Sequence, residues 1–176
     1  MTPDPSPEAS RALLQWPDLR WRWRRFQRLR VDELHDILAA RQRVFSVEQE
    51  CAFLDIDGCD ERAAHLAAWS AAQREPLAYA RLLDPGVKYV EASIGRVMTS
   101  AAARGAGLGR EVFRRALARA RSAWPELGVR ISAQSRLEAF YQGFGFVAAG
   151  ATYLEDGIAH TEMLLAPGVR RLRLQK

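Results

Sequence analysis

The sequence predicts one α+β domain in which a mixed central sheet of about six to seven strands is flanked by helices. Three features of the 176 residues lead to this fold class. Strand-like segments come first, strand-like and helix-like segments then alternate, and a turn pair, Asp156-Gly157, separates two strand-like segments near the end. A chain of this length can bury a core without metals or disulfides, so we expect a single domain over residues 19–168.

The first elements are an edge strand and an amphipathic helix. Apolar and charged side chains alternate along Trp21-Arg22-Trp23-Arg24, which is typical of a strand with one buried face. Between Val31 and Phe45 apolar residues recur at helical spacing, and Asp32 is placed to cap this helix. The acidic segment 47–61 contains the turn pair Asp57-Gly58 and is expected to be a loop or a short helix.

Further strands are expected in the middle of the chain and near its end. The apolar segments 65–71 and 76–83 flank a short polar stretch, which predicts a hairpin. Residues 92–99 form a further strand that runs toward a glycine-rich loop at residues 104–109. Near the end, residues 146–154 and 158–165 are expected to form a second hairpin around Asp156-Gly157, because Asp-Gly favours tight two-residue turns.

Helices separate these strands. The segment from Gly107 to residue 123 places apolar residues on one face and arginines on the other, and Pro125 marks its end. A short strand at residues 129–134 and a short helix at residues 137–142 follow, and Gly143 terminates that helix.

The basic character of the chain belongs to its ends. Ten of the 26 basic residues lie in the acid-free segments 20–30 and 170–176, which leaves 16 basic residues against 21 acidic ones elsewhere. Residues 1–18 are expected to form a disordered tail, and residues 169–176 to form a basic tail. Cys51 and Cys59 have no metal-site spacing and no secretory or membrane-spanning segment accompanies them, so we expect reduced thiols in a cytoplasmic protein.

The glycine loop resembles an anion-binding site. Glycine tolerates positive φ and lets backbone N–H groups approach a ligand, while the following helix presents unpaired N–H groups and a positive dipole end. Together these features suit a phosphate or pyrophosphate. The spacing Gly-x-Gly-x-Gly fits neither a Rossmann nor a Walker loop, and a glycine-rich loop before an ordinary surface helix is an equally good interpretation of this segment alone.

Two motifs in order resemble the GNAT superfamily of acetyl-CoA-dependent N-acetyltransferases. One is Arg104-x-x-Gly107-x-Gly109, and the other, about thirty residues later, is Phe140-Tyr141-Gln142-Gly143-Phe144-Gly145-Phe146. Finer similarity to the ElaA-like subgroup comes from segments 47–51, 55–58, 94–97 and 155–160. The resemblance covers roughly residues 34–165 and implies the acyl-CoA N-acyltransferase fold.

The resemblance also implies where acetyl-CoA binds. The strand before the loop would pair with the pantetheine arm, and a backbone N–H on it, expected to be that of Met98, would stabilise the oxyanion. Loop amides would hold the pyrophosphate. The implied cofactor-binding residues are Val97, Met98, Thr99, Arg104, Gly105, Ala106, Gly107, Leu108, Gly109, Arg110, Gln134 and Phe140.

Tyr141 matches the tyrosine that protonates the departing CoA thiolate in many relatives, although it could instead only pack with Phe140 and Phe144. Glu91 lies thirteen residues before Arg104, where histone acetyltransferases carry a general base, but a surface glutamate at a strand start is the commoner outcome. Other candidate bases are Glu48, His65, His160 and Glu162. The spacing of Asp55, Asp57 and Asp60 fails for a calcium loop, so we expect a turn and no metal site.

The function expected from this resemblance is acetyl transfer from acetyl-CoA to a primary amine, small molecule or peptide, by direct attack in a ternary complex. A homodimer is possible, and neither nucleic acid nor membrane is expected as a partner. Two alternatives stay open. The arginines of residues 20–30, interleaved with Trp21 and Trp23, contain the ingredients of a single-strand nucleic-acid-binding module. The chain could also bind CoA without turnover.

Overall fold

The computed structural model describes residues 16–168, within which eight strands form one sheet. The strands are β1 (Arg20–Arg25), β2 (Ala63–Trp69), β3 (Ala78–Leu83), β4 (Ala92–Thr99), β5 (Val129–Gln134), β6 (Val147–Ala148), β7 (Tyr153–Glu155) and β8 (Ile158–Leu165). The α-helices are α2 (Val31–Gln42), α3 (Leu108–Ala123) and α4 (Glu138–Gln142). Short helical turns are η1 (Phe26–Arg28), η2 (Arg43–Val47), η3 (Asp60–Arg62), η4 (Ala101–Ala103) and η5 (Ser135–Leu137).

The sheet is mixed, as expected. Its order is β1-β2-β3-β4-β5-β8-β6, and β7 pairs with the other end of β8. Neighbouring strands are antiparallel except β4 and β5, which are parallel. The edge strand, the first hairpin, the strand before the glycine loop and the long helix after it all lie where the sequence predicts them.

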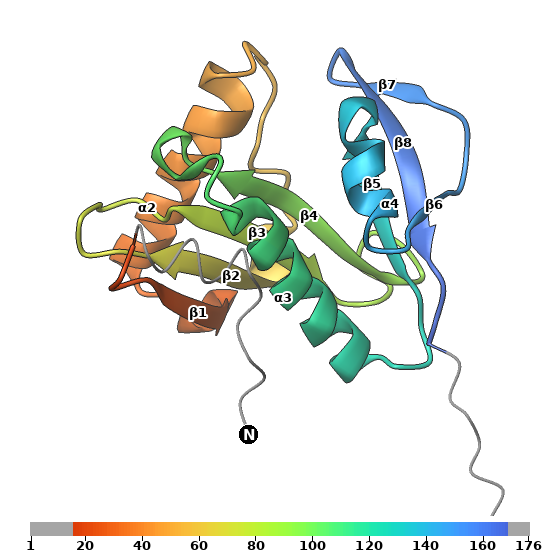
Figure 1. Ribbon diagram of the computed structural model, residues 1–176, viewed down its shortest axis with the longest axis horizontal. Helices are drawn as coiled ribbons and strands as arrows, with labels where there is room; N and C mark the ends of the chain where they lie inside the picture. Colours follow the sequence, from red (N-terminus) through yellow and green to blue (C-terminus); the bar gives the residue numbers. More distant parts are fainter. Residues whose placement is uncertain (1–15, 169–176) are drawn as a thin grey trace, which may run out of the picture.

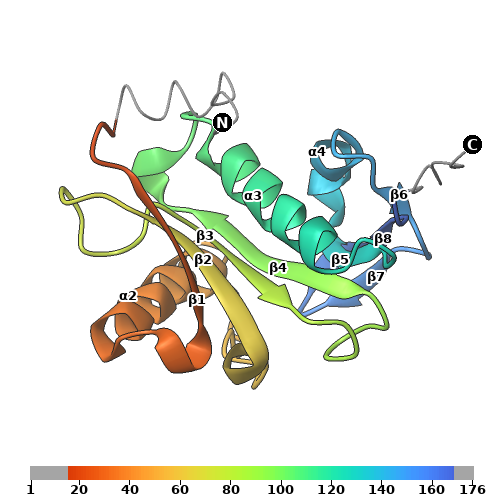
Figure 2. The same ribbon diagram turned by 90° about the horizontal axis from the view of Figure 1, so that it is seen from below.

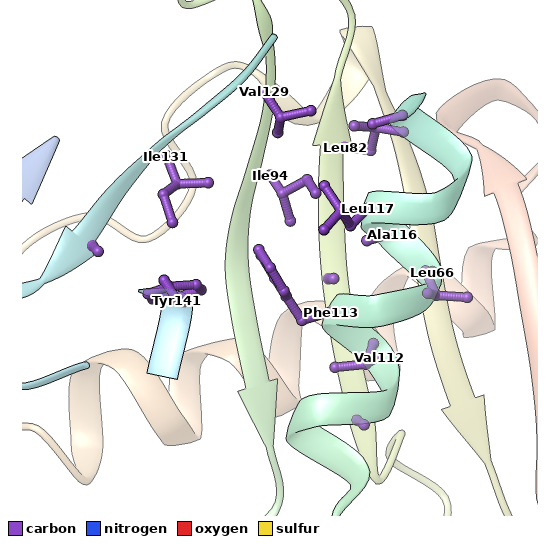
Figure 3. Packing of buried hydrophobic residues seen from close by; sticks show 14 of the residues in the cluster. Leu66, Leu82, Ile94, Val112, Phe113, Ala116, Leu117, Val129, Ile131 and Tyr141 are labelled. Atoms are coloured by element: carbon purple, nitrogen blue, oxygen red, sulfur yellow. The ribbon is translucent and has the colours of Figure 1, made fainter. Parts of the chain in front are cut away.

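Helices cover both faces of the sheet, with α3 and α4 on one face and α2 on the other (Figures 1 and 2). The larger core lies under α3, where Phe113 is fully buried against strand residues such as Ile94 and Ile131 (Figure 3). A smaller core under α2 contains Ile37 and Met98. The sheet is therefore buried from both sides, which explains the continuous burial of β3.

The start of α2 differs from the sequence prediction. Asp32 was expected to be its cap, but the helix begins two residues earlier, with Arg30 as the N-cap residue. The carboxylate of Glu33 accepts the backbone N–H of Arg30 at 3.1 Å, while Asp32 is ion-paired with the Arg30 side chain. The prediction of Asp32 as the cap was wrong because the residue at the third helical position satisfies the first free N–H group instead.

The last expected hairpin is also modified. The segment 146–154 was predicted as one strand, but it forms two short strands, β6 and β7, that pair with opposite ends of β8. Five residue steps from Ala148 to Tyr153 face three steps on β8, so the register shifts. The intervening Ala-Gly-Ala sequence has little preference for a strand. The turn itself is as predicted, with φ of 54° at Asp156 and 78° at Gly157.

A bulge in β4 determines how the sheet opens. Between the pairs Tyr79–Met98 and Arg81–Gly95, β3 advances two residues and β4 three. Arg96 lies in this bulge with a φ of 52°, in the left-handed region. β4 pairs with β5 only through Ala92 and Ser93, so the rest of β4 has no neighbour on that side. The two strands diverge beyond this point (Figure 1).

Residues 16–18, which precede β1, pack against the rest of the domain. The Asp18 carboxylate accepts the hydroxyl of Ser70 at 2.7 Å, and Trp16 packs against the larger core. Residues 16–18, which were expected to belong to a disordered tail, are therefore part of the packed structure. The remainder of that expected tail, and the basic tail at residues 169–176, lie outside the described residues. Within residues 16–168, none of the helices combines the length and apolar character needed to cross a bilayer.

Candidate active site

A cleft of about 610 Å³ lies where β4 and β5 diverge. Its walls come from β4, from the end of β5, from the segment that follows α2, and from the turn between β7 and β8. Among the residues expected to bind the cofactor, Val97, Met98, Thr99, Arg104 and Gln134 line it. The structure thus brings residues from the two divergent strands and from the glycine loop to one site.

The glycine loop has the expected backbone conformation. Gly105 and Gly107 have φ values of 78° and 81°, in the region that favours glycine. Gly107 is the N-cap residue of α3, so the helix begins directly from the loop. The first turn of this helix directs N–H groups toward the loop, which is the geometry of an anion site. Phosphate binding itself remains a prediction.

Tyr141 lies at the base of the cleft and also packs into the core. Its ring centroid is 4.9 Å from that of Phe113, which lies next to it in Figure 3. The Phe140 centroid is 5.0 Å away. Burial raises the pKa of the Tyr141 phenol to about 12. The side chain is buried among aromatic rings and also lines the cleft, and its role as a proton donor stays a prediction. A phenol in this environment is protonated at neutral pH.

Phe140 and Arg110 lie beside Tyr141 and form one stack. The guanidinium carbon of Arg110 is 5.5 Å from the centre of the Phe140 ring and 5.1 Å from that of Phe144. This contact ties the first turn of α3 to α4. The glycine loop and the tyrosine are consequently held at a fixed separation by aromatic packing.

Glu91 is not brought to the cleft. Both of its carboxylate oxygens accept hydrogen bonds from Arg130, at 2.9 and 3.0 Å, and Arg130 also binds Glu162. The hydrogen bond from Arg130 holds the pKa of Glu91 below its usual value. A carboxylate engaged in this way, outside the cleft, is poorly placed to act as a base.

The two histidines suggested as bases differ in position. The ring of His65 is buried, with Nδ1 at 2.7 Å from the Tyr79 hydroxyl and Nε2 at 3.0 Å from the Asp60 carbonyl oxygen. Burial lowers the pKa of His65, so this residue is a neutral core histidine. His160 does line the cleft, and its Nδ1 is 2.9 Å from the carbonyl oxygen of Ile158. Glu48 lines the cleft as well.

A charge cluster that is buried in part, with Arg96 and Asp57 reaching solvent, supports the wall of the cleft. It consists of three arginines, from α2, β3 and β4, and three aspartates from the loop before β2. Its members are Arg41, Arg81, Arg96, Asp55, Asp57 and Asp60. Arg41 is fully buried, and its Nε and Nη1 donate to Asp55 and Asp60 at 2.7 and 2.6 Å.

The aspartates do form a turn, as expected, because Asp57 accepts the backbone N–H of Cys59 at 3.1 Å. Their role as partners of buried arginines was not predicted. The available signal was Arg41, a charged residue at an apolar position of a helix. Among residues 16–168 no group of acidic, histidine or cysteine side chains is arranged to hold a metal ion.

Residues 48–51, here called the crossing segment, span the cleft. The side chain of Glu48 is ion-paired with Arg104 of the glycine loop. Gln49 accepts a hydrogen bond of 2.9 Å from Gln134 at the end of β5. The thiol of Cys51 is 3.9 Å from the carbonyl oxygen of Asp156. The crossing segment thus contacts the glycine loop, β5 and the β7–β8 turn.

The arginine- and tryptophan-rich strand β1 lies at the sheet edge. Trp21 and Trp23 pack against the larger core, and the guanidinium carbon of Arg115 is 4.6 Å from the centre of the Trp21 ring. The aromatic side chains are therefore engaged within the protein, while the arginines of β1 are exposed. This arrangement removes the observation that favoured base stacking.

Comparisons with known proteins agree on the fold. A family model described as an acetyltransferase (GNAT) domain matches residues 46–166. The crystal structure of an acyl-CoA N-acyltransferase from Pseudomonas aeruginosa is 43% identical, with a TM-score of 0.79 over 84% of this chain and 99% of that one. That of Escherichia coli ElaA is 36% identical, with a TM-score of 0.76 over 83% and 98%. A UPF0039 protein of Synechocystis is 42% identical over 84% of this chain and 95% of its own.

Replacing Asp60 tests the charge cluster. Burial alone raises the pKa of Asp60, but hydrogen bonds and charge from Arg41 and Arg81 outweigh this effect and hold it below its usual value. Its contribution to stability is then complete above the unfolded-state pKa of about 4 and is lost as the pH falls below it. We expect Asp60→Asn to lower the free energy of unfolding at pH 7 by about 3 kcal/mol, and the deficit to shrink as the pH falls below about 4.

Urea unfolding at several pH values measures this difference. Asp156→Asn makes the same chemical change in an exposed turn and should alter the free energy of unfolding by less than about 0.5 kcal/mol at every pH. If the deficit in the free energy of unfolding of Asp60→Asn is small, or does not change with pH, Asp60 is not the ionised partner of Arg41 and Arg81.

Proposed function

The chain belongs to the GNAT family of acetyltransferases and has its fold, and we propose that it transfers the acetyl group of acetyl-CoA to a primary amine by direct attack in a ternary complex. The observation that carries this proposal is the common position of three features. One cleft is bordered by the divergent edge of β4 and by the Tyr141 side chain. The glycine loop adjoins it, since Arg104 at the start of the loop lines the cleft and Gly107 begins α3.

The donor fits this cleft chemically. Beyond Ser93 no strand pairs with β4 on its β5 side, so backbone groups of residues 97–99 that face this side could hydrogen-bond to the amides of the pantetheine arm, as one more strand would. Amides of the glycine loop and of the start of α3 suit the pyrophosphate. Gln134 lies on the opposite wall. The proposed loop contacts come from Arg104, Gly105, Ala106, Gly107, Leu108, Gly109 and Arg110, and Phe140 supports them through Arg110.

The proposed reaction has one attacking and one leaving group. The amine nitrogen attacks the thioester carbon, the new C–N bond forms, and the C–S bond breaks. A backbone N–H of residues 97–99, with Met98 as the expected donor, stabilises the charge that develops on the carbonyl oxygen. Tyr141 donates its phenolic proton to the CoA thiolate, the amine loses a proton to water, and the phenolate recovers one from solvent. Glu91 has no part in this proposal, because Arg130 engages it outside the cleft.

Two further features of the proposal concern the protein's setting. Cys51 and Cys59 are both free thiols, which suits a reducing cytoplasmic compartment. The two strand edges, at β1 and β6, would be the contact surfaces of a homodimer. Nucleic acid and membrane are not proposed as partners.

A thiol-release assay tests the proposed activity. We expect free CoA to accumulate from acetyl-CoA only when an amine from a panel of spermidine, glucosamine, tyramine and a lysine-bearing peptide is present. Butyryl-CoA and octanoyl-CoA, used in parallel, test the choice of acetyl as the acyl group. CoA binding without amine-dependent release from any donor would instead identify a non-catalytic CoA-binding protein.

The role of Tyr141 is tested by removing one oxygen atom. We expect Tyr141→Phe to reduce kcat by about 10²-fold, because the thiolate then leaves without a proton donor. The affinity for CoA, measured by calorimetry, should change little since the ring and its packing remain. An unchanged kcat would remove Tyr141 from the mechanism.

The glycine loop is tested by a charged substitution with a matched control. Gly107→Glu places a carboxylate where the pyrophosphate is proposed to bind and should abolish the rise in melting temperature that CoA causes. Gly86→Glu introduces the same charge at a glycine of similar φ, 79° against 81°, in a turn remote from the loop. Both variants carry backbone strain, but only Gly107→Glu should lose the response to CoA. A normal response in Gly107→Glu would show that the loop does not bind the donor.

A further inference from the structure

The side chain of Arg104 is held at the mouth of the cleft by two oxygen atoms. One belongs to the carboxylate of Glu48, with which Arg104 forms an ion pair. The other is the backbone carbonyl oxygen of Thr99, at 3.4 Å. Both contacts use the same nitrogen, Nη2, so Glu48 lies next to the divergent edge of β4.

These two contacts compete with the proposed donor. Arg104 is the first residue of the glycine loop, and a pyrophosphate bound there would place a strong anion beside its guanidinium. Arginine binds phosphate oxygens through paired hydrogen bonds, which favours phosphate over a single half-exposed carboxylate contact. The Thr99 carbonyl is likewise an acceptor that the pantetheine arm would need.

Among the ion pairs of residues 16–168, Glu48 takes part only in the one with Arg104. The charge of Arg43 also acts on Glu48, but Arg43 is ion-paired with Glu75. The other cations that line the cleft are engaged elsewhere. Arg81 and Arg96 bind the aspartates of the charge cluster, Arg136 donates to Gln134, and Lys88 lies 3.9 Å from Glu155. A Glu48 that has lost Arg104 is consequently a cleft carboxylate without an ion-pair partner among the described residues.

We propose that donor binding exchanges the partner of Arg104, from the carboxylate of Glu48 to the pyrophosphate of acyl-CoA, and thereby releases Glu48 to bind the ammonium group of the acceptor. This inference rests on the proposed function, because it requires CoA in the cleft. It makes the donor bind before the acceptor. It also identifies the acceptor class as amines that are cationic in solution.

If this exchange occurs, removing the Glu48 carboxylate strengthens CoA binding, and the gain requires Arg104. We expect Glu48→Gln to raise the affinity for CoA about two- to fivefold, since the donor no longer breaks an ion pair. In the Arg104→Gln background the same substitution should change the affinity less than about 1.5-fold. Glu50→Gln removes an equal charge two residues away, at an exposed position, and should leave the affinity unchanged.

Calorimetric titration of CoA into the four variants and the wild type tests whether Arg104 exchanges its partner. An equal gain from Glu48→Gln in both backgrounds would mean simple repulsion between Glu48 and the phosphates, and would overturn the exchange. A wild type that binds no CoA would instead overturn the proposed function.

The release of Glu48 is tested separately with n-butylammonium chloride. This salt should raise the melting temperature of the wild type when CoA is saturating but not when CoA is absent. Sodium chloride is the ionic control. Glu48→Gln should lose this response, and Glu50→Gln should keep it. A response that is independent of CoA, or none in the CoA-bound wild type, would overturn the assignment of Glu48 as the ammonium site.

Discussion

The geometry of the cleft depends on a single residue in an unusual conformation, Arg96 in the bulge of β4. A non-glycine residue in the left-handed region costs about 1 kcal/mol or more, so it persists only where other contacts determine it. Here the guanidinium of Arg96 is 2.7 Å from Asp55 and 3.2 Å from Asp57. The bulge adds a residue to β4 just beyond its short pairing with β5, where the strands begin to diverge.

The same aspartates explain why arginines can be buried beneath this wall. Arg41 and Arg81 are almost inaccessible to solvent, and an unpaired guanidinium there would carry a large desolvation cost. Their partners Asp55 and Asp60 come from the loop before β2, and Asp57 completes the cluster. Ion pairs therefore link α2, β3, β4 and this loop, and the crossing segment lies in the chain between α2 and the aspartates.

The opposite side of the cleft is built by apolar packing. Phe113 of α3 contacts the rings of Tyr141 and Phe144, and Arg110 stacks on the same group. The charge cluster thus shapes the wall of the cleft that includes β4. The packed aromatic rings position the glycine loop and the Tyr141 phenol beside the cleft. The proposed donor contacts come from both sides, from β4 and from the glycine loop, and Glu48 of the crossing segment is the proposed ammonium site.

Local patterns in the sequence were sufficient for most elements and for the outline of the site. Alternation in β1, helical spacing in α3 and the Asp156-Gly157 turn depend on neighbouring residues alone, and all three are present as predicted. The glycine conformations of the loop are local as well. The roles expected for Glu91 and Asp32, by contrast, were inferred from position alone. In the structure Arg130 engages the Glu91 carboxylate, and Arg30 is the N-cap residue of α2.

The sequence by itself therefore determined the fold family, the order of the elements and the conformation of the glycine loop. Only the tertiary structure decided which charges meet. Arg41, Arg81 and Arg96 bind aspartates from 14 to 41 residues away, and Glu48 binds Arg104 across 56 residues. Ion pairs between distant residues follow from how the sheet and helices pack, and periodicity along the chain carries no information about them.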